Sequence, residues 1–304
     1  KNAMSFDERH LKDPACFQEN RLAAHSDHIA YAGMEELARG ESSLRWPLDG
    51  LWKFFYARNE DQVIPGFESS GYDCHPWADI PVPAHIQLEG YGAPQYVNVQ
   101  YPWDGVEDVP LGDVPREHNP VACYVRYFFL PEAMCGQRVL VRFEGAESCV
   151  AVWLNGHYVG FAADSFSPAE FELTPYLTGG ENKLACRVYR WNVGSWLDQD
   201  FFRFSGLFRS VSLICIPKAH LWDIRVQTLL DDAYTDATLA LDVLLMLGEG
   251  GQGATLHAAL MDGKMDCAAL LRLLAQLAPE ATCTLELMQD RPSLRWLEEQ
   301  ELLE

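Results

Sequence analysis

Two carboxylates and an amide stand directly before a dense group of phenylalanines in the segment 194–209. The acids are Asp198 and Asp200 with Gln199 between them, and the aromatic residues that follow are Phe201, Phe202, Phe204 and Phe208. Carboxylates beside aromatic rings are costly unless they are paired, hydrogen-bonded or bound to a cation or ligand. Sugars present apolar C–H faces ringed by hydroxyl groups, so aromatic faces next to acids and amides suit them. The segment is therefore a candidate carbohydrate site.

The same acids have a structural interpretation, as ion-pair partners of Arg203 and Arg209. Structural ion pairs outnumber binding sites, so residue types alone favour this alternative. Glycosidic acid–base chemistry does use two carboxylates. However, Asp198 and Asp200 share one face only in an extended segment, and a turn would leave their relation open. The sequence therefore does not assign them as a catalytic pair.

The loop 91–102 is a second candidate for sugar binding. Tyr91, Tyr96 and Tyr101 recur every five residues in a stretch too rich in glycine and proline to be regular. Asn98 lies among them, and its side-chain amide can both donate and accept hydrogen bonds. Such an amide beside aromatic rings could bind sugar hydroxyl groups, or Asn98 could simply form a turn.

Several motifs that carry chemistry are missing from the sequence. It contains no G-x-S-x-G, H-E-x-x-H, Walker or dinucleotide-binding motif. The nine histidines do not cluster at metal-ligand spacing, and His25, His85 and His157 are interpreted as core or surface residues. No catalytic residue is assigned in this chain.

Composition narrows the class of protein. The 304 residues carry a formal net charge of −21, which argues against nucleic-acid binding and against adsorption to an anionic membrane surface. Apolar runs such as 239–247 are far shorter than the roughly 20 residues of a membrane span, and no secretory signal is visible. Nine cysteines without a C-x-x-C spacing indicate reduced thiols and a cytoplasmic location. The opening Lys-Asn-Ala-Met is interpreted as an expression-tag remnant before a start Met4.

Short strand-like segments separated by turns dominate residues 46–218. Asn155-Gly156 is typical of a type I′ hairpin turn, and residues 89–120 are expected to form a long irregular loop. This pattern predicts an all-β fold that begins with a β-sandwich or jelly roll. The expected strands are 51–56, 80–83, 123–130, 138–143, 149–154, 157–161, 169–173, 182–190 and 210–216.

A boundary is expected near Pro217, followed by a second unit at 219–304. Its size matches an immunoglobulin-like sandwich, with or without the last strand, and the tail 297–304 has no stop-like feature, so the chain is expected to be cut there. Residues 1–45 are expected to be an N-terminal extension with a short helix at 34–39. Strands are expected at 221–229, 236–247, 254–261 and 283–288, with a Gly-rich turn at 248–253 and helix-forming residues at 267–277.

Taken in order over residues 8–230, a set of motifs resembles the N-terminal part of β-galactosidases of glycoside hydrolase family 2. Single motifs such as Leu-Asn-Gly are weak, but the ordered set is specific, and after residue 230 only the pattern matches. The motifs begin at Asn20 (NRLAAH), Leu48 (LDGLWKF), Gly90 (GYGAPQYVNVQYP), Asn119 (NPVACY), Phe143 (FEGAES), Trp153 (WLNGHYVG), Ser167 (SPAEF) and Asp198 (DQDFFRFSGLFR).

The resemblance implies a galactose-binding-like jelly roll at 46–218 followed by an immunoglobulin-like domain. In the family a TIM barrel comes next and carries both catalytic glutamates, with a magnesium ion nearby. The reaction is hydrolysis with retention, through a covalent glycosyl-enzyme. This chain ends before such a barrel, so the resemblance implies an N-terminal fragment with no catalytic residue that is inactive alone.

The resemblance also implies roles for two loop residues. Asn98 matches the family's asparagine that reaches the galactose hydroxyl groups, and Asp200 matches the aspartate that contacts galactose and helps to hold a sodium ion. The sequence differs from the family pattern at one point. The family commonly has Leu-Glu-Asp-Gln-Asp, whereas this chain has Leu197-Asp-Gln-Asp200, with one acid fewer. The spacing to Ser205-Gly-Leu-Phe-Arg still aligns Asp200.

Two other functions remain open at this point. The chain could be a stand-alone carbohydrate-binding module, or part of a family 2 enzyme of another specificity, such as a β-glucuronidase or β-mannosidase. The motifs around Asn98 and Asp200 favour the galactosidase branch. The resemblance then implies a β-galactoside substrate, the missing TIM barrel as partner, Na⁺ and Mg²⁺ as cofactors, and a homo-oligomer for the full-length protein.

Overall fold

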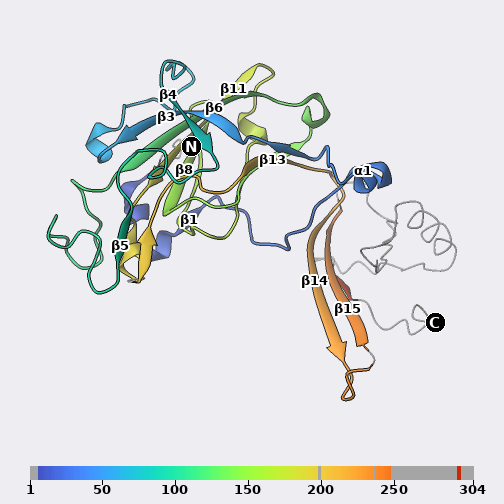
Figure 1. Cartoon of the computed structure of the whole chain (residues 1–304). Coiled ribbons are helices and arrows are strands. Elements are labelled where there is room, and N and C mark those ends of the chain that lie inside the picture. Colours follow the sequence, from blue (N-terminus) through green and yellow to red (C-terminus); the bar gives the residue numbers. More distant parts are fainter. Residues whose placement is uncertain (1–5, 198–199, 236, 248–292, 296–304) are drawn as a thin grey trace. The chain divides into compact units, whose positions relative to one another are not determined.

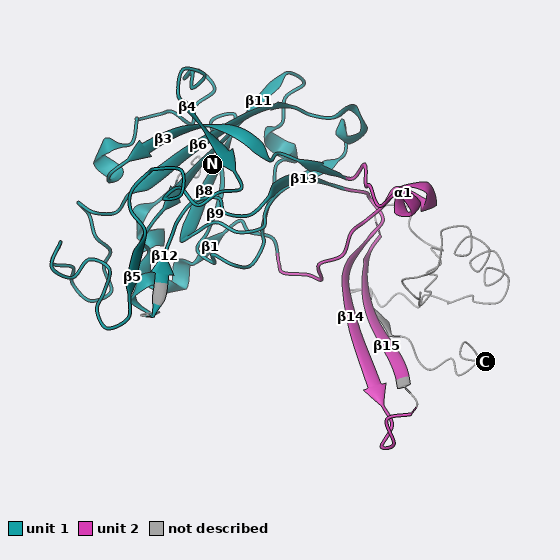
Figure 2. Cartoon of the chain, viewed as in Figure 1, with its two compact units in different colours: residues 1–22, 45–215 teal, residues 23–44, 216–304 magenta. Residues whose placement is uncertain are grey.

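The computed structural model describes residues 6–197, 200–235, 237–247 and 293–295 (Figure 1). The chain divides into two compact units: residues 1–22 together with 45–215, and residues 23–44 together with 216–304 (Figure 2). The segment 1–45, expected to be one extension, is thus shared between the units. Within the described residues, no helix is long and apolar enough to cross a membrane.

The first unit is built on two antiparallel sheets, as the all-β prediction requires. The larger has seven strands in the order β1-β9-β8-β11-β6-β3-β4, and the smaller has the order β10-β7-β13-β2. Their bounds are β1 Gln18–Glu19, β2 Arg45–Pro47, β3 Gly50–Ala57, β4 Ala78–Val82, β6 Val121–Phe129, β7 Arg138–Phe143, β8 Cys149–Leu154, β9 His157–Ala162, β10 Ala169–Glu172, β11 Glu181–Tyr189 and β13 Val211–Ile216. Short 3-10 turns connect them at η1 Glu8–Leu11, η2 Pro14–Cys16, η3 Glu60–Gln62, η4 Glu132–Met134, η5 Thr174–Tyr176 and η6 Val193–Trp196.

The two sheets stack face to face, and a glycine shows how closely. A Cβ built on Gly160 of β9 would lie 2.7 Å from the ring of Phe171, which belongs to β10 of the other sheet. It would also lie 2.5 Å from the carbonyl oxygen of Glu19 in the neighbouring strand β1. Only a residue without a side chain fits between these groups, and Phe171 is fully buried.

The predicted hairpin between β8 and β9 is confirmed. Asn155 and Gly156 have φ values of 52° and 84°, both in the left-handed region that a type I′ turn requires. The Asn155 side chain donates to the carbonyl oxygen of Tyr176 at 2.8 Å and to Oδ1 of Asn182 at 2.8 Å. The turn is therefore fixed to the rest of the sandwich by its own side chain.

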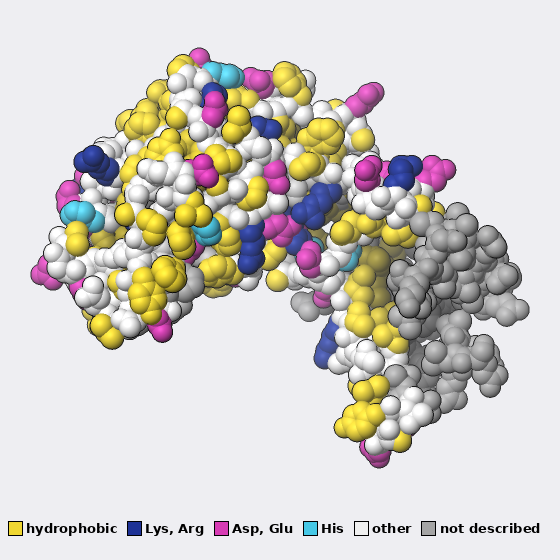
Figure 3. Space-filling model, viewed as in Figure 1, with side chains coloured by type: hydrophobic (Ala, Val, Ile, Leu, Met, Phe, Trp, Pro, Cys, Tyr) yellow, Lys and Arg dark blue, Asp and Glu magenta, His cyan; other side chains and the backbone are white. Residues whose placement is uncertain are grey.

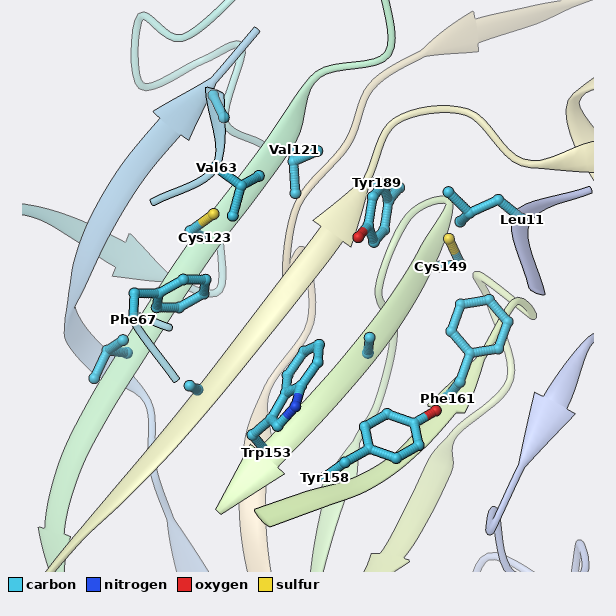
Figure 4. Close-up of a cluster of buried hydrophobic side chains, with 14 of the residues drawn as sticks. Leu11, Val63, Phe67, Val121, Cys123, Cys149, Trp153, Tyr158, Phe161 and Tyr189 are labelled. Carbon is cyan, nitrogen blue, oxygen red and sulfur yellow. The ribbon is translucent and has the colours of Figure 1, made fainter. Parts of the chain in front are cut away.

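Large aromatic side chains fill one core of the first unit (Figure 4). Phe67 and Phe161 are fully buried, and Tyr189 is 1% exposed. The rings of Trp153 and Tyr158 pack at an angle of 58° with their centroids 5.5 Å apart. Burying each such side chain contributes roughly 1.5–3 kcal/mol, so this cluster is a main source of stability for the sandwich.

A third, much smaller sheet lies beside the sandwich strands. It pairs β5, Gln95–Val97, with β12, Phe201–Arg203, in an antiparallel ribbon (Figure 1). The expectation of an entirely irregular loop over 89–120 is therefore wrong at β5. Three residues without apolar alternation carry too little signal for a strand to be predicted.

The second unit is described in part. It contains helix α1, Met34–Arg39, as expected, and the strands β14 His220–Leu230, β15 Ala237–Met246 and β16 Ser293–Arg295. Val243 and Leu245 are buried in a small cluster. The expected strands at 254–261 and 283–288, the turn at 248–253 and the helix-forming residues at 267–277 lie outside the described residues, so the immunoglobulin-like topology stays a prediction.

Candidate functional site

The β5–β12 ribbon brings Asn98 and Asp200 to the same end. Val97 is the register partner of Phe201. Asn98 follows Val97 directly and Asp200 precedes Phe201 directly, so the antiparallel register places the two side by side. Both residues are exposed. Two segments about 100 residues apart in the chain thus meet at one place, as expected, while the binding roles of the two side chains stay a prediction.

Asp200 is bound across the ribbon by a tyrosine. The hydroxyl group of Tyr96 donates to Oδ1 of Asp200 at 2.5 Å. This hydrogen bond raises the pKa of Tyr96, because the phenol must keep its proton to donate to a carboxylate. The Tyr96 ring also packs against Phe202 of β12, with centroids 5.0 Å apart. Tyr96 therefore orients the carboxylate, a role that its recurrence in the loop did not reveal.

The contact that the structure gives for Asp200 is the hydrogen bond from Tyr96, and not an ion pair with Arg209. Arg209 instead donates to the carbonyl oxygens of Phe166 at 2.7 Å and Glu144 at 3.4 Å. The exposed carboxylate is held by a neutral hydroxyl group, so its negative charge remains available to a donor or a cation.

The loop after Asn98 lines a pocket of about 520 Å³ together with Trp196, and its lining includes the acids Asp104, Glu107 and Asp108. Tyr101 and Trp103, from the loop after Asn98, form one side, and Trp196, just before Asp200, forms another. The Tyr101 and Trp196 rings lie with centroids 4.4 Å apart. The motif analysis missed both tryptophans, although aromatic residues so close to both candidate segments were a usable signal.

Side-chain hydrogen bonds to backbone carbonyl groups hold the ribbon and Trp196 against the loop after Asn98. Gln95 of β5 donates through its side chain to the carbonyl oxygen of Pro102 at 2.7 Å. Trp196 donates through its indole N–H to the carbonyl oxygen of Asp113 at 2.6 Å. Tyr96 and Phe202 of the ribbon are exposed, and Figure 3 shows that hydrophobic side chains also lie at many places on the visible face of the first unit. The ribbon thus carries exposed Asn98 and Asp200, and the loop after Asn98 carries a pocket with both aromatic and acidic side chains.

The described residues hold no complete metal centre. No group of three or more His, Cys, Asp or Glu side chains gathers within them to hold an ion. Asp200 can offer one oxygen ligand, which suits a hard cation such as Na⁺ only if further ligands come from elsewhere. For Mg²⁺ the described residues offer no fitting set.

A match to known proteins covers nearly all of the longer segment, 45–215, of the first unit. The sugar-binding domain model of glycosyl hydrolases family 2 matches residues 46–217, more than half of the chain. This chain belongs to glycosyl hydrolase family 2. The resemblance read from the ordered motifs is thereby confirmed, and the first unit is the family's sugar-binding domain.

Curated relatives within family 2 are β-galactosidases. The enzyme of Halalkalibacterium halodurans is 50% identical over 223 residues, which are 73% of this chain and 22% of that protein. The enzyme of Streptococcus thermophilus is 46% identical over 219 residues, 72% of this chain and 21% of that protein. The chain therefore spans about a fifth of the length of these relatives.

A solved structure supports the fold. A β-glycosidase from Bacteroides vulgatus superimposes with a TM-score of 0.50 at 23% identity, over 67% of this chain and 24% of that one. At this identity the likeness shows the fold alone. About two thirds of this chain thus have a fold that is also found in that β-glycosidase.

Proposed function

We propose that this chain is the N-terminal part of a β-galactosidase that hydrolyses terminal β-D-galactosides with retention of configuration. The observation that carries the proposal is the convergence of Asn98 and Asp200 on one exposed ribbon, within a domain whose relatives are named β-galactosidases. The two catalytic glutamates and the barrel that bears them would lie outside this chain. Its contribution is to bind and orient the sugar.

The two ribbon residues suit a galactose because their hydrogen-bonding capacities differ. Asn98 can donate through its NH₂ group and accept through its carbonyl oxygen, whereas ionised Asp200 only accepts. Sugar hydroxyl groups do both, so the pair can satisfy two neighbouring hydroxyl groups at once. Hydrogen bonds to a charged carboxylate are the stronger ones, and Tyr96 already fixes one oxygen of that carboxylate.

Sodium is proposed as a cofactor of the complete enzyme, with Asp200 as one ligand. Its exposed carboxylate beside the sugar site would hold the ion, and the other protein ligands would come from outside this chain. A bound Na⁺ would supply a positive charge that attracts a sugar hydroxyl oxygen. Mg²⁺ is proposed only for the part of the enzyme outside this chain. A cytoplasmic location, homo-oligomeric assembly and contact with the barrel likewise stay predictions.

The test is Asp200→Asn in the complete gene product, which removes a charge with little change of shape. We expect kcat/KM for a β-galactoside to fall at least 100-fold and the stimulation by Na⁺ to disappear, while the protein stays folded. Asp61→Asn is the matched control, because the Asp61 side chain is 66% exposed, lies on η3 and forms its ion pair with Arg116, which is in neither strand of the ribbon. The chain alone should show no turnover.

Retained activity and retained Na⁺ stimulation in well-folded Asp200→Asn protein would overturn the proposal. Asn98→Ala provides a second, independent arm. It should raise KM for the galactoside by about tenfold, since one lost hydrogen bond is worth roughly 1–1.5 kcal/mol.

A further inference from the structure

The backbone hydrogen bonds between the segment before β5 and the segment after β12 are interrupted between the sandwich and the ribbon. On the sandwich side, the backbone N–H of Ile86 donates to the carbonyl oxygen of Ser205 at 3.0 Å. On the ribbon side, Gln95 is the register partner of Arg203. Eight residues lie between Ile86 and Gln95, whereas one residue, Phe204, lies between Arg203 and Ser205. The backbone ladder therefore cannot run on continuously from the sandwich into the ribbon.

Arg190 spans this interruption. Its Nη2 donates to the carbonyl oxygen of Ala93, just before β5, at 3.0 Å. The same nitrogen donates to the carbonyl oxygen of Arg203, in β12, at 3.0 Å. One guanidinium nitrogen thus bonds both β12 and the segment that leads into β5.

The other end of Arg190 is fixed to the middle of the large sheet. Arg190 directly follows β11, which lies between β8 and β6. Its backbone N–H donates to the carbonyl oxygen of Pro120 at 3.0 Å, and its guanidinium lies 4.8 Å from the ring centroid of Trp191. The side chain therefore connects a central strand to the base of the ribbon.

A glycine allows the ribbon segment to approach this side chain. Gly92 has a φ of 75°, a conformation that favours glycine. A Cβ at this position would lie 3.1 Å from the hydroxyl oxygen of Tyr56 and 3.9 Å from Nη1 of Arg190. The backbone at residues 92 and 93 consequently runs close enough for Arg190 to reach the Ala93 carbonyl group.

The surroundings of Arg190 include one buried acid. Burial lowers the pKa of Arg190, and the charge of Glu147 opposes that shift. An arginine remains protonated at neutral pH even so, because its ordinary pKa is above 12. Glu147 exchanges two backbone hydrogen bonds with Gly206, at 3.1 and 3.0 Å, so it sits beside the segment that leads out of β12.

We infer that Arg190 is a positioning residue that fixes the β5–β12 ribbon relative to the sandwich. Its effect on Asn98 and Asp200 as sugar-binding groups rests on the proposed function. Its effect on the ribbon itself does not, because the two carbonyl contacts are independent of any ligand. Lysine cannot replace it fully, since the planar guanidinium fork presents its donors in a fixed geometry.

The first experiment is hydrogen–deuterium exchange on the whole chain, wild type against Arg190→Met and Arg190→Lys. We expect amides in peptides over 93–98 and 200–204 to exchange at least tenfold faster in Arg190→Met, with a smaller effect in Arg190→Lys. Exchange in β6 and β11 should not change. Arg126→Met is the matched control, because Arg126 also donates from its guanidinium to a backbone carbonyl oxygen, that of Leu51 at 2.6 Å, away from the ribbon.

Unchanged exchange in the ribbon of both folded Arg190 variants would overturn the inference. So would an equal increase across β6 and β11, because that would make Arg190 a general stabilising residue. If Arg190→Met does not fold, Arg190→Lys decides by the same criterion.

The second experiment measures kinetics in the complete gene product. Arg190→Ala should lower kcat/KM for a β-galactoside at least tenfold, since small misplacements of binding groups are costly. Added methylguanidinium should restore part of that activity, and it should not affect Arg126→Ala. Absence of rescue together with normal ribbon exchange would count against the inference. Fast ribbon exchange with no effect of Asp200→Asn on activity would leave Arg190 as the positioning residue and reject the proposed function alone.

Discussion

The sandwich core and the β5–β12 ribbon belong to the same unit but are held in opposite ways. Phe161 and its neighbours in the core are removed from water almost completely. In the ribbon, Tyr96 and Phe202 remain 50% and 58% exposed, and each strand has three residues. Two-stranded ribbons of this size are marginal by themselves. The place where sugar chemistry is proposed therefore depends on polar contacts supplied by the core.

Those polar contacts are concentrated at the base of the ribbon. The side chain of Gln87 donates to the hydroxyl oxygen of Ser205 at 2.8 Å and accepts from the backbone N–H of the same residue at 3.0 Å. Both residues are buried. Together with Arg190, this pair attaches a weakly stabilised element to a strongly stabilised one. The contrast shows how a domain can present exposed polar groups and still hold them in a defined position.

The largest effect on the free energy of unfolding should come from a substitution in the sandwich core. Phe161→Ala removes a fully buried ring, and we expect the free energy of unfolding to fall by about 3–5 kcal/mol. Phe202→Ala, in the ribbon, should change it by no more than about 0.5 kcal/mol. Urea denaturation followed by circular dichroism measures both. Similar losses of unfolding free energy in the two variants would show that the ribbon contributes to global stability as much as the core does. The contrast between the two regions would then be wrong.

A pH experiment probes the junction between the two regions. Burial raises the pKa of Glu147 to about 7, against 4.5 for the exposed group, while Arg203 and Arg190 oppose the shift. The folded chain then binds more protons than the unfolded chain between these values, so stability falls as the pH rises from about 4.5 to about 7. Glu147→Gln should make that fall smaller by about 1–3 kcal/mol, as measured by urea unfolding at pH 4.5, 6 and 7.5. An identical pH dependence in the variant would refute the buried-acid argument.

The smallest expected effect on global stability belongs to Gln87→Ala. It leaves the buried Ser205 N–H and hydroxyl group without this partner, at a cost of about 1–3 kcal/mol to the local structure. We expect this loss to be felt as faster amide exchange in the ribbon, with a change in the urea midpoint close to the error of measurement. A large shift of the midpoint without faster exchange would place Gln87 in the sandwich rather than at the ribbon's base.

The strands of the sandwich could be predicted because their residues repeat a local signal. Arg138–Phe143 alternates with period two, and the turn residues Asn155 and Gly156 mark the β8–β9 hairpin directly. The ribbon offers no such signal, because β5 and β12 are short, exposed and separated by about 100 residues. Residue types alone favoured a salt bridge for Asp200. The convergence with Asn98 was expected only from the resemblance to the family, and the contacts of Tyr96 and Arg190 needed the fold itself.

Three tryptophans in contact, Trp103, Trp191 and Trp196, give the molecule an intrinsic fluorescence signal. Trp103 lies with its ring centroid 5.0 Å from that of Trp196 and 6.1 Å from that of Trp191. Indole groups this close exchange excitation energy, so light absorbed by any of the three is emitted by the group as a whole. Trp196 precedes Asp200 by four residues in the sequence, and the guanidinium of Arg190 lies over the ring of Trp191. Movement at either position would alter the part of the emission that these three of the nine tryptophans contribute.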